Sequence, residues 1–242
     1  KTSQLNTDDV VLEVGPGPGA LTLELARVCR QVIAGEKDKA LSALLEEKLA
    51  QNNVGNVEIV IDDILQFLNS KSCKLKAINY QVVANIPYYL TSALIRKLLE
   101  LPRPPENIFL TIQKEVAQRI CATNKKESLL SLSVKFYADP KIHFYISRGS
   151  FLPAPKVDSA FIEITPKKSH SPIAPERFFA VLKAGFSSPR KKLISNLSIN
   201  LLNIDKTTLS LIFQKLNISE SIRPEKLSLQ QWLSLSQCLE VQ

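Results

Sequence analysis

The sequence is poor in several residue types that define whole classes of proteins. Its 242 residues include four cysteines, with no Cys-x-x-Cys pair, and two histidines. Such few and scattered ligands argue against a zinc site and against a disulfide framework, so we expect no bound metal and a reducing compartment. No apolar run approaches the roughly 18 residues of a membrane-spanning helix, and no signal peptide stands at the start. We therefore expect a cytoplasmic protein without a membrane segment.

Methionine is absent altogether, and the first residue is Lys1. We take this to mean that the sequence is a fragment or a processed chain whose true amino terminus is missing. The hydrophobic content of 45% and the charged content of 22% are ordinary for a globular protein, and the length suits one large domain and one small domain. The net charge of +8 favours a polyanionic partner, because positive potential attracts phosphates before contact.

Strand-like and helix-like patterns alternate through the first half of the chain. Apolar runs predict five buried strands, at residues 10–14, 31–35, 57–61, 81–84 and 108–112. Between them, leucines and isoleucines recur at helical spacing. This alternation predicts βαβ units in an α/β domain with a doubly wound, mostly parallel sheet. Residues 130–137 are expected to form another strand, and further extended segments are expected at 142–146 and 160–164.

The segment 166–172, Pro-Lys-Lys-Ser-His-Ser-Pro, has the composition of a linker. We place the domain boundary there, with a first domain at 1–168 and a second at 169–242. The second domain is expected to be small and all-helical, with helices at 175–186, 191–202, 205–216 and 228–239.

A glycine-rich turn, from Gly15 through Gly17 to Gly19, follows the first predicted strand and opens a helix. Glycines let backbone amides approach a ligand, and the free amides of the first helical turn point to the same place. The Gly-x-Gly-x-Gly spacing differs from the Gly-x-Gly-x-x-Gly of dinucleotide sites and favours a smaller adenosyl ligand. The alternative is a purely structural turn.

Acidic residues follow the second and third predicted strands. Glu36 lies about 20 residues after the glycine turn, where an acid accepts hydrogen bonds from the ribose of a nucleoside. Of Asp62 and Asp63, one is placed to bind the amine of an adenine, and the other is a turn residue. For a lone acid such as Glu36, the alternative is an exposed loop position.

The fourth predicted strand ends in Asn85-Ile86-Pro87-Tyr88, which is poor core material. Asn85 offers an acceptor oxygen, Pro87 keeps the residue before it extended, and Tyr88 offers a flat face. These groups suit a planar, amine-bearing base at the carboxyl edge of a sheet. Phe151 opens a proline-bracketed loop that is suited to stacking a base. The alternatives are a plain strand-to-helix turn and an aromatic anchor in the core.

The densest basic cluster is Arg190-Lys191-Lys192, at the start of a predicted helix. Cations are unfavourable at this end of a helix because of the helix dipole, and a phosphate partner would relieve that conflict. A solvated helix start is the alternative.

Taken in order, these motifs resemble those of the ribosomal RNA adenine dimethyltransferases, the bacterial small-subunit type in particular. The resemblance covers essentially the whole chain, and the matching motifs are Gly15 to Gly19, Glu36, Asp63, Asn85 to Tyr88, Gln113 to Arg119, Phe151 to Ser159, and Phe186 to Leu197. It implies a Rossmann-like, S-adenosylmethionine-dependent methyltransferase domain and a helical RNA-recognition domain. It further implies a monomer that dimethylates the exocyclic amine of two adjacent adenosines in small-subunit rRNA during subunit assembly.

The same resemblance implies roles for single residues. The three glycines at 15, 17 and 19 would lie against the methionine portion of the cofactor, Glu36 would hold its ribose, and Asp63 its adenine. Relatives carry a Gly-Gln-Asn-Phe-like motif before the first strand that closes over the cofactor, and this sequence begins after it.

For the target base, Asn85, Pro87 and Tyr88 would form the active site, with Asn85 also beside the cofactor. Phe151 would stack on the far face of the base, and the cluster Arg190-Lys191-Lys192 would contact RNA. Two other functions stay open. One is a large-subunit rRNA methyltransferase of the erythromycin-resistance type, and the other is a non-catalytic RNA-binding or assembly factor that keeps the fold.

Overall fold

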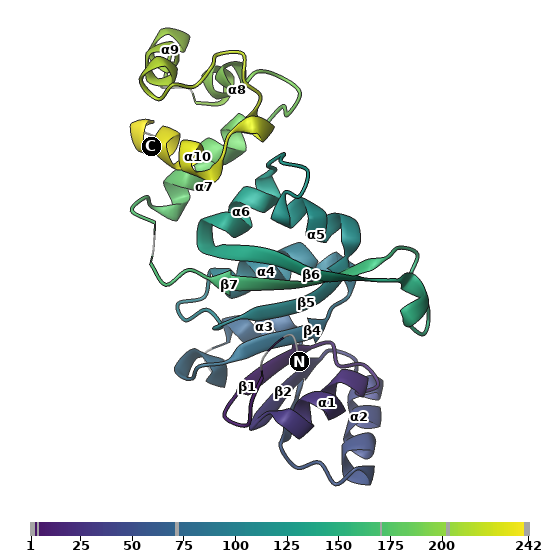
Figure 1. Cartoon of the computed structure of the whole chain (residues 1–242). Coiled ribbons are helices and arrows are strands. Elements are labelled where there is room, and N and C mark those ends of the chain that lie inside the picture. Colours follow the sequence, from purple (N-terminus) through teal and green to yellow (C-terminus); the bar gives the residue numbers. More distant parts are fainter. Residues whose placement is uncertain (1–2, 4, 71–72, 170, 202–203, 240–242) are drawn as a thin grey trace. The chain divides into compact units, whose positions relative to one another are not determined.

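The computed structural model describes residues 3, 5–70, 73–169, 171–201 and 204–239, apart from the side chain of Lys76. The chain packs as two compact units, each described here by itself (Figure 1). The first unit comprises residues 1–117 and 138–166, and the second comprises residues 118–137 and 167–242.

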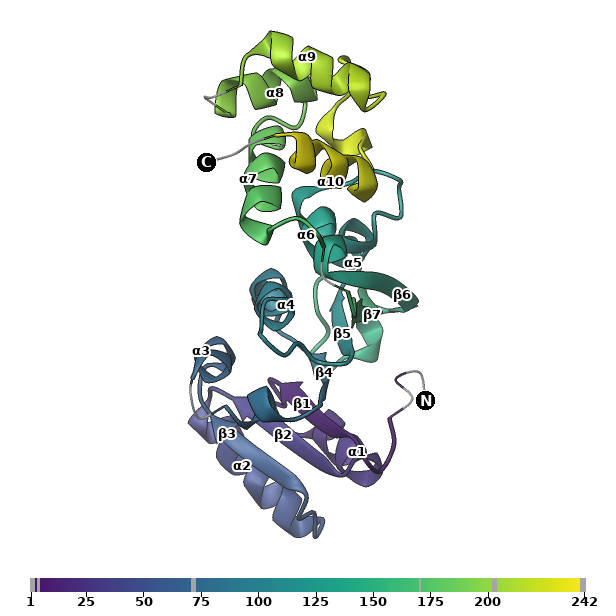
Figure 2. The same cartoon turned by 90° about the vertical axis from the view of Figure 1, so that its left-hand side faces the viewer.

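A seven-stranded sheet in the order β3-β2-β1-β4-β5-β7-β6 forms the first unit (Figure 2). The strands are β1 (Val10–Val14), β2 (Gln31–Glu36), β3 (Val57–Ile61), β4 (Gln81–Asn85), β5 (Ile108–Gln113), β6 (Ala138–Ile146) and β7 (Ser159–Pro166). The first five are mutually parallel, whereas β7 runs antiparallel to β5, and β6 antiparallel to β7. The predicted doubly wound, mostly parallel sheet is therefore confirmed.

Helices cover both faces of this sheet, because its central strands are apolar on both sides. They are α1 (Ala20–Val28), α2 (Lys39–Gln51), α3 (Ile64–Asn69) and α4 (Thr91–Leu99). The unit also holds the short 3₁₀ turns η1 (Lys74–Ala77), η2 (Tyr88–Leu90) and η3 (Arg148–Ser150), and the start of α5 (Lys114–Cys121), which continues into the second unit. Leu25 of α1 packs with Val11 and Val32, and Leu45 of α2 packs with Ala34, so both helices lie on one face. In Figure 1, α3 and α4 lie behind the sheet, on the other face.

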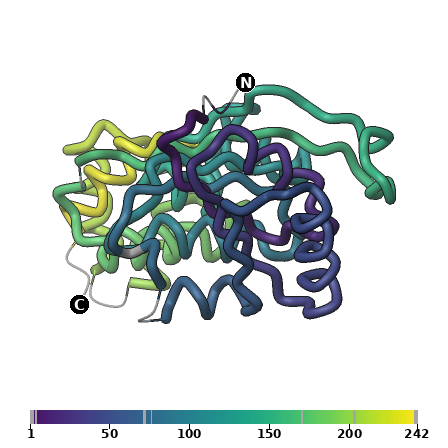
Figure 3. Tube along the Cα trace, turned by 90° about the horizontal axis from the view of Figure 1, so that it is seen from below, coloured from purple at the N-terminus to yellow at the C-terminus, as the bar shows by residue number. Residues whose placement is uncertain are grey.

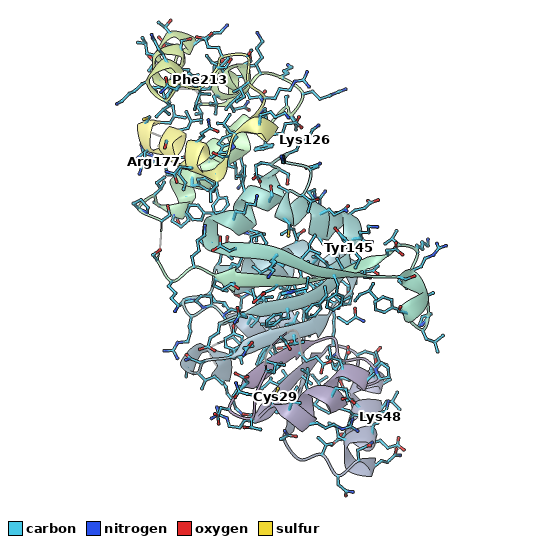
Figure 4. All side chains as sticks on the ribbon, in the orientation of Figure 1. Cys29, Lys48, Lys126, Tyr145, Arg177 and Phe213 are labelled. Atoms are coloured by element: carbon cyan, nitrogen blue, oxygen red, sulfur yellow. The ribbon has the colours of Figure 1, made fainter. Side chains whose placement is uncertain are left out.

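The second unit is helical in the part that the structure describes. Its elements are α6 (Leu129–Tyr137), α7 (Pro175–Gly185), α8 (Leu193–Asn200), α9 (Lys206–Lys215), η4 (Pro224–Lys226) and α10 (Leu229–Cys238). Trp232, Phe178 and Phe213 are fully buried at its centre, and Figure 4 labels Phe213. The helices predicted at 175–186, 191–202, 205–216 and 228–239 thus appear with slightly shorter bounds.

The strand predicted at 130–137 is wrong, because this segment forms the helix α6. Its alternating leucines and serines resemble a half-buried strand, but Ser128 starts a helix: its hydroxyl accepts the Ser131 N–H at 3.1 Å. The helical turn then brings Leu132 and Phe136, four residues apart, to one side. Both are buried in the core of the second unit, where Phe136 stacks on Phe178 with ring centroids 4.4 Å apart.

The packing groups residues 118–137 with the helices that follow residue 167. The boundary after residue 168, with a Rossmann-like domain at 1–168 and a helical domain at 169–242, stays a prediction. Within residues 3–239, apart from the gaps named above, no helix is long and apolar enough to span a lipid bilayer.

Gly185, at the end of α7, provides a test of the packing in the second unit. A methyl group added there would lie 2.4 Å from the ring of Trp232 and 2.8 Å from Leu193. We expect Gly185→Ala to lower the free energy of unfolding by about 1–3 kcal/mol, the usual cost of overpacking a core. Trp232, the single tryptophan, reports the transition by its fluorescence during urea denaturation. Gly55→Ala, where no atom lies within 4 Å of the added methyl, is the control and should leave the midpoint unchanged.

Candidate active site at the carboxyl edge of the sheet

The strand order places a topological switch point between β1 and β4. β1 pairs in parallel with β2 on one side and with β4 on the other, so the chain leaves these neighbouring strands in different directions. Open α/β sheets bind ligands outside the carboxyl ends of the strands at such a point. The glycine turn follows β1, and the Asn85–Tyr88 stretch begins at the last residue of β4. The fold therefore brings these two motifs to the same edge.

The glycine turn depends on the absence of side chains. Gly15, Gly17 and Gly19 have φ angles of 67°, 53° and 80°, in the left-handed region that favours glycine. A methyl group at Gly15 would lie 3.6 Å from Pro87 Cδ, at van der Waals distance, so the turn lies close to the Asn85–Tyr88 stretch. A methyl group at Gly17 would meet no atom within 4 Å, so the backbone there faces open space. The turn thus presents bare backbone beside Pro87.

Glu36 lies against this glycine turn. It is the last residue of β2, and its polar side chain is buried. Its Oε2 accepts the Gly17 N–H at 3.3 Å, and its Oε1 accepts the Asp38 N–H at 3.0 Å. The predicted ribose-binding acid and the predicted glycine turn are therefore in contact, and the acid helps to hold the turn.

The two acids after β3 have different local roles. Asp62 Oδ1 accepts the N–H of Asp63 at 2.7 Å, as a turn residue does. Asp63 caps α3, because its Oδ1 accepts the Leu65 N–H at 3.0 Å, while its Oδ2 lies 3.5 Å from Lys37 Nζ. Asp63 is half-buried at the carboxyl end of β3, and its role toward an adenine stays a prediction.

The Asn85–Tyr88 stretch alternates between anchoring and exposed side chains. Asn85 and Pro87 are exposed, whereas Ile86 between them is buried. The Pro87 carbonyl accepts the N–H of Leu90 at 3.0 Å, which fixes the turn η2. The hydroxyls of Tyr88 and Ser159 lie 3.1 Å apart, so the half-buried phenol is tied to the first residue of β7. The exposed amide of Asn85 and the hydrogen-bonded phenol of Tyr88 thus belong to the same four-residue stretch at the sheet edge.

Phe151 lies in the loop that leads into β7. It is half-buried and ends the turn η3, where its N–H is donated to the Arg148 carbonyl at 3.3 Å. Because Ser159 pairs with Gln113 at the carboxyl end of β5, this loop reaches the edge where Asn85 lies. Arg190, Lys191 and Lys192 belong to the second unit, and all three side chains are exposed.

The sequence analysis missed Glu13, an acid inside the otherwise apolar β1. Glu13 is 1% exposed, and burial raises its pKa from 4.5 to about 7, although the nearby Thr22 hydroxyl lowers it in part. Neither Glu13 Oε2 nor Thr22 Oγ1 has a hydrogen-bond partner of good geometry within the described part of the protein. Thr22 lies in the first turn of α1, directly after the glycine turn. A single acid within the run Val-Val-Leu-Glu-Val was the signal that pointed to this position.

Lys48 was also missed. Its Nζ donates to the Pro18 carbonyl at 2.8 Å, from a position on α2 that Figure 4 labels. This contact joins the glycine turn to a helix 30 residues further along the chain. Helical spacing could not identify it, because an exposed lysine on a helix is ordinarily solvated.

The fold and this edge define a Rossmann-like methyltransferase. A crystal structure of the 23S rRNA methyltransferase ErmE aligns with a TM-score of 0.77 and 27% identity, covering 98% of this chain and 93% of that one. The structure of a dimethyladenosine transferase from Plasmodium falciparum aligns with a TM-score of 0.80 and 25% identity, covering 96% of this chain and 90% of that one.

The family follows from the sequence match. Residues 1–240 match the model of the family described as ribosomal RNA adenine dimethylase, and the chain belongs to this family. Proteins named ribosomal RNA small subunit methyltransferase A are similar to it. That of Dehalococcoides mccartyi strain CBDB1 is 37% identical over 240 residues, which are 98% of this chain and 80% of the relative. That of Fusobacterium nucleatum is 34% identical over 249 residues, which cover 99% of this chain and 90% of the relative.

Enzymes of this family use S-adenosylmethionine, and the observed edge fits that cofactor. Glu13 Oε2 and Thr22 Oγ1 are buried polar atoms beside the glycine turn that lack good partners. Gly17 leaves room for a ligand to approach the backbone. In the described residues no cluster of three or more histidine, cysteine or acidic side chains is arranged to hold a metal ion.

The raised pKa of Glu13 predicts a specific pH dependence of stability. Between pH 4.5 and about 7, the folded protein keeps a proton that the unfolded chain releases, so stability is highest below this window. The free energy of unfolding should then fall by up to about 3 kcal/mol as the pH rises through the window. Glu13→Gln should remove this fall and be more stable than the wild type above it.

Urea denaturation of both proteins at about pH 5 and about pH 8, without cofactor, measures the difference. If the free energies of unfolding of the two proteins differ by the same amount at both pH values, Glu13 does not titrate in this range. Glu24→Gln, at an exposed position of α1, is the matched control and should follow the wild type.

Proposed function

We propose that this protein transfers methyl groups from S-adenosylmethionine to the exocyclic amines of two adjacent adenosines in small-subunit ribosomal RNA. The observation that carries the proposal is the close approach of the glycine turn to the Asn85–Tyr88 stretch at the switch point of the sheet, where a methyl group at Gly15 would lie 3.6 Å from Pro87 Cδ. A cofactor held by one and a base held by the other would meet at this edge. The similarity to proteins named for the small subunit, at 34–37% identity, supports the choice of RNA.

Gly15, Gly17, Gly19, Glu36 and Asp63 are the proposed cofactor ligands. Glu36 suits the ribose because its carboxylate already lies against the glycine turn, and Asp63 suits the adenine because it stands at the end of the adjacent strand β3. When bound, the cofactor supplies an electrophilic methyl group on a sulfonium. The protein's own side chains then bind and orient the target amine.

An adenine amine is a weak nucleophile because its lone pair is delocalised into the ring. A hydrogen bond from this amine to Asn85 Oδ1 favours a pyramidal nitrogen whose lone pair is free to attack. The Pro87 carbonyl is the second proposed acceptor, through the lone pair that Leu90 N–H leaves unused. Tyr88 and Phe151 supply flat faces that replace the stacking lost when the base leaves the RNA. Rate then comes mainly from orientation and from fixed polar groups.

RNA selection is assigned to the second unit. Arg190, Lys191 and Lys192 stand at the start of α8, where Lys192 occupies the N-cap position without a side-chain cap. The described part of the chain shows no ion pair to any of the three. Asn196 Nδ2 donates to the carbonyls of Gly185 and Ser188, at 2.6 and 2.9 Å, which holds the loop before the cluster in one shape. A preformed basic loop binds phosphates with less loss of entropy.

Methylation of large-subunit rRNA is the second candidate, and the similarity to ErmE favours it. Primer extension on both rRNAs after incubation with labelled cofactor separates the two candidates. A non-catalytic RNA-binding factor is disfavoured by the intact Asn85-Ile86-Pro87-Tyr88 motif. The proposal further includes action as a monomer in the cytoplasm, where ribosomal subunits are assembled.

Two substitutions should separate chemistry from cofactor binding. Asn85→Ala should abolish methyl transfer while cofactor and RNA affinities stay near those of the wild type, because its role is to orient the amine. Glu36→Ala should instead weaken cofactor binding by about 1.5–3 kcal/mol, as expected for hydrogen bonds to a charged group. Calorimetry with the cofactor and transfer of labelled methyl groups to unmethylated small subunits measure the two effects. Near-normal transfer by Asn85→Ala would assign Asn85 to a structural turn.

Replacing Arg190, Lys191 and Lys192 with alanine should weaken rRNA binding and flatten its salt dependence. Each phosphate contact contributes about 0.7–0.9 to the slope of log affinity against log salt, so three contacts contribute roughly 2–3. The control removes equal charge from the same unit, through alanine at Lys206, Lys215 and Arg223, which are also exposed. A slope that falls equally in both triple variants would mean that net charge, rather than this cluster, attracts the RNA.

A further inference from the structure

Two side chains of the first unit are far more exposed than apolar side chains usually are. Tyr89 is 87% exposed and Leu152 is 101% exposed, the two highest values among the large hydrophobic residues that the structure describes. Single exposed apolar residues are common and need no explanation. These two, however, directly follow Tyr88 and Phe151, the two residues proposed to contact the target base. Each of the two proposed base-contacting residues is thus followed in the sequence by a solvated apolar group.

Tyr89 is held in place by its backbone. It is the middle residue of η2, which the Leu90 N–H to Pro87 carbonyl hydrogen bond closes at 3.0 Å. The buried Thr91 donates its hydroxyl to the Tyr88 carbonyl at 3.0 Å. Because the Tyr88 phenol lies 3.1 Å from the Ser159 hydroxyl and the turn is closed by hydrogen bonds, the backbone that carries the solvated Tyr89 ring is ordered. A backbone that is already ordered loses little entropy when the ring binds a flat partner.

Leu152 belongs to a segment that is anchored at the same edge of the sheet. It follows Phe151 in the long connection between β6 and β7, which projects from the sheet in Figures 1 and 3. The end of this connection is fixed to the carboxyl end of β5, because the Lys114 N–H is donated to the Asp158 carbonyl at 3.0 Å. Its start is fixed as well, since Asp158 Oδ1 accepts the Arg148 N–H at 3.1 Å. β5 lies next to β4, the strand that ends in Asn85.

We infer that Tyr89, with Leu152 beside the same site, is the contact surface for the nucleotide next to the target adenosine, whose base stacks on the Tyr89 ring. This inference rests on the proposed function and deepens it. When one of two adjacent adenosines leaves the stack to enter the active site, its neighbour loses a stacking partner. An exposed aromatic ring replaces that partner for any base, because every base has a π face. The surface therefore recognises RNA by an unstacked neighbouring base rather than by hydrogen bonds.

A coupled test removes the ring and the base separately and together. The RNA is a small-subunit rRNA fragment with both adenosines, and in two matched fragments one adenosine or the other is abasic. For the wild type, removing the neighbouring base should lower kcat/KM of the remaining adenosine roughly 5- to 100-fold, the range of one base–aromatic stack. Tyr89→Ala should cause the same loss on the intact fragment, and no further loss when the base is also missing.

Three further variants complete the experiment. Tyr89→Phe keeps the ring and should behave like the wild type on all fragments, which a general loss of folding would not produce. Leu152→Ala should lower kcat/KM on the intact fragment by a smaller factor than Tyr89→Ala does. On the abasic fragments, Leu152→Ala should have the same kcat/KM as the wild type. Leu44→Ala, at an exposed apolar position of α2, is the matched control and should respond to the abasic change as the wild type does.

The outcomes distinguish this inference from the function on which it rests. Wild-type methylation that is unaffected by the abasic change would overturn the inference and leave the proposed function intact. The same follows if Tyr89→Ala loses as much on abasic RNA as on intact RNA. A wild-type protein that binds the cofactor but methylates neither adenosine of the intact fragment would overturn the proposed function, and this inference with it.

Discussion

The site depends on one close approach, that of the glycine turn to the Asn85–Tyr88 stretch. Parallel pairing of β1 with β4 brings the ends of these strands together, so that Pro87 Cδ lies 3.6 Å from where a methyl group at Gly15 would be. The left-handed backbone of the turn makes glycine the residue with least strain at these positions. In the proposed function, this close approach places the cofactor side of the edge next to the base side.

Polar groups around this edge serve both the fold and the site. Glu36 holds the glycine turn through Gly17, and Lys48 holds it through the Pro18 carbonyl, so the turn is fixed from two elements. Glu13 is buried at a cost, since its raised pKa records an unfavourable environment for the charged form. Burying an ionisable group without a partner destabilises a protein, and such groups are therefore found mainly at functional sites. The edge is thus organised in advance of ligand binding.

In the proposed function, the two units have different tasks, and their compositions suit those tasks. The sheet unit has apolar central strands and puts its polar residues at strand ends, which suits a small planar ligand. The helical unit encloses Trp232, Phe178 and Phe213 and displays its basic cluster on a loop that Asn196 fixes. A pocket for one base cannot choose among the many adenosines of an rRNA, so selection must use shape and phosphates elsewhere. A basic surface on a separate unit meets that need.

The sequence by itself determined the five parallel strands, the helices after residue 175, the glycine turn and the residues at the strand ends. Each of these is local, because apolar runs, helical spacing and turn residues act within a few positions. The tertiary structure decided what depends on distant partners. Residues 130–137 follow a strand pattern, yet the Ser128 cap and the aromatic core of the second unit make them helical. The partners of Tyr88, Glu36 and Lys48 come from other elements, and the burial of Glu13 arises only once helices cover β1, so no local pattern could reveal them.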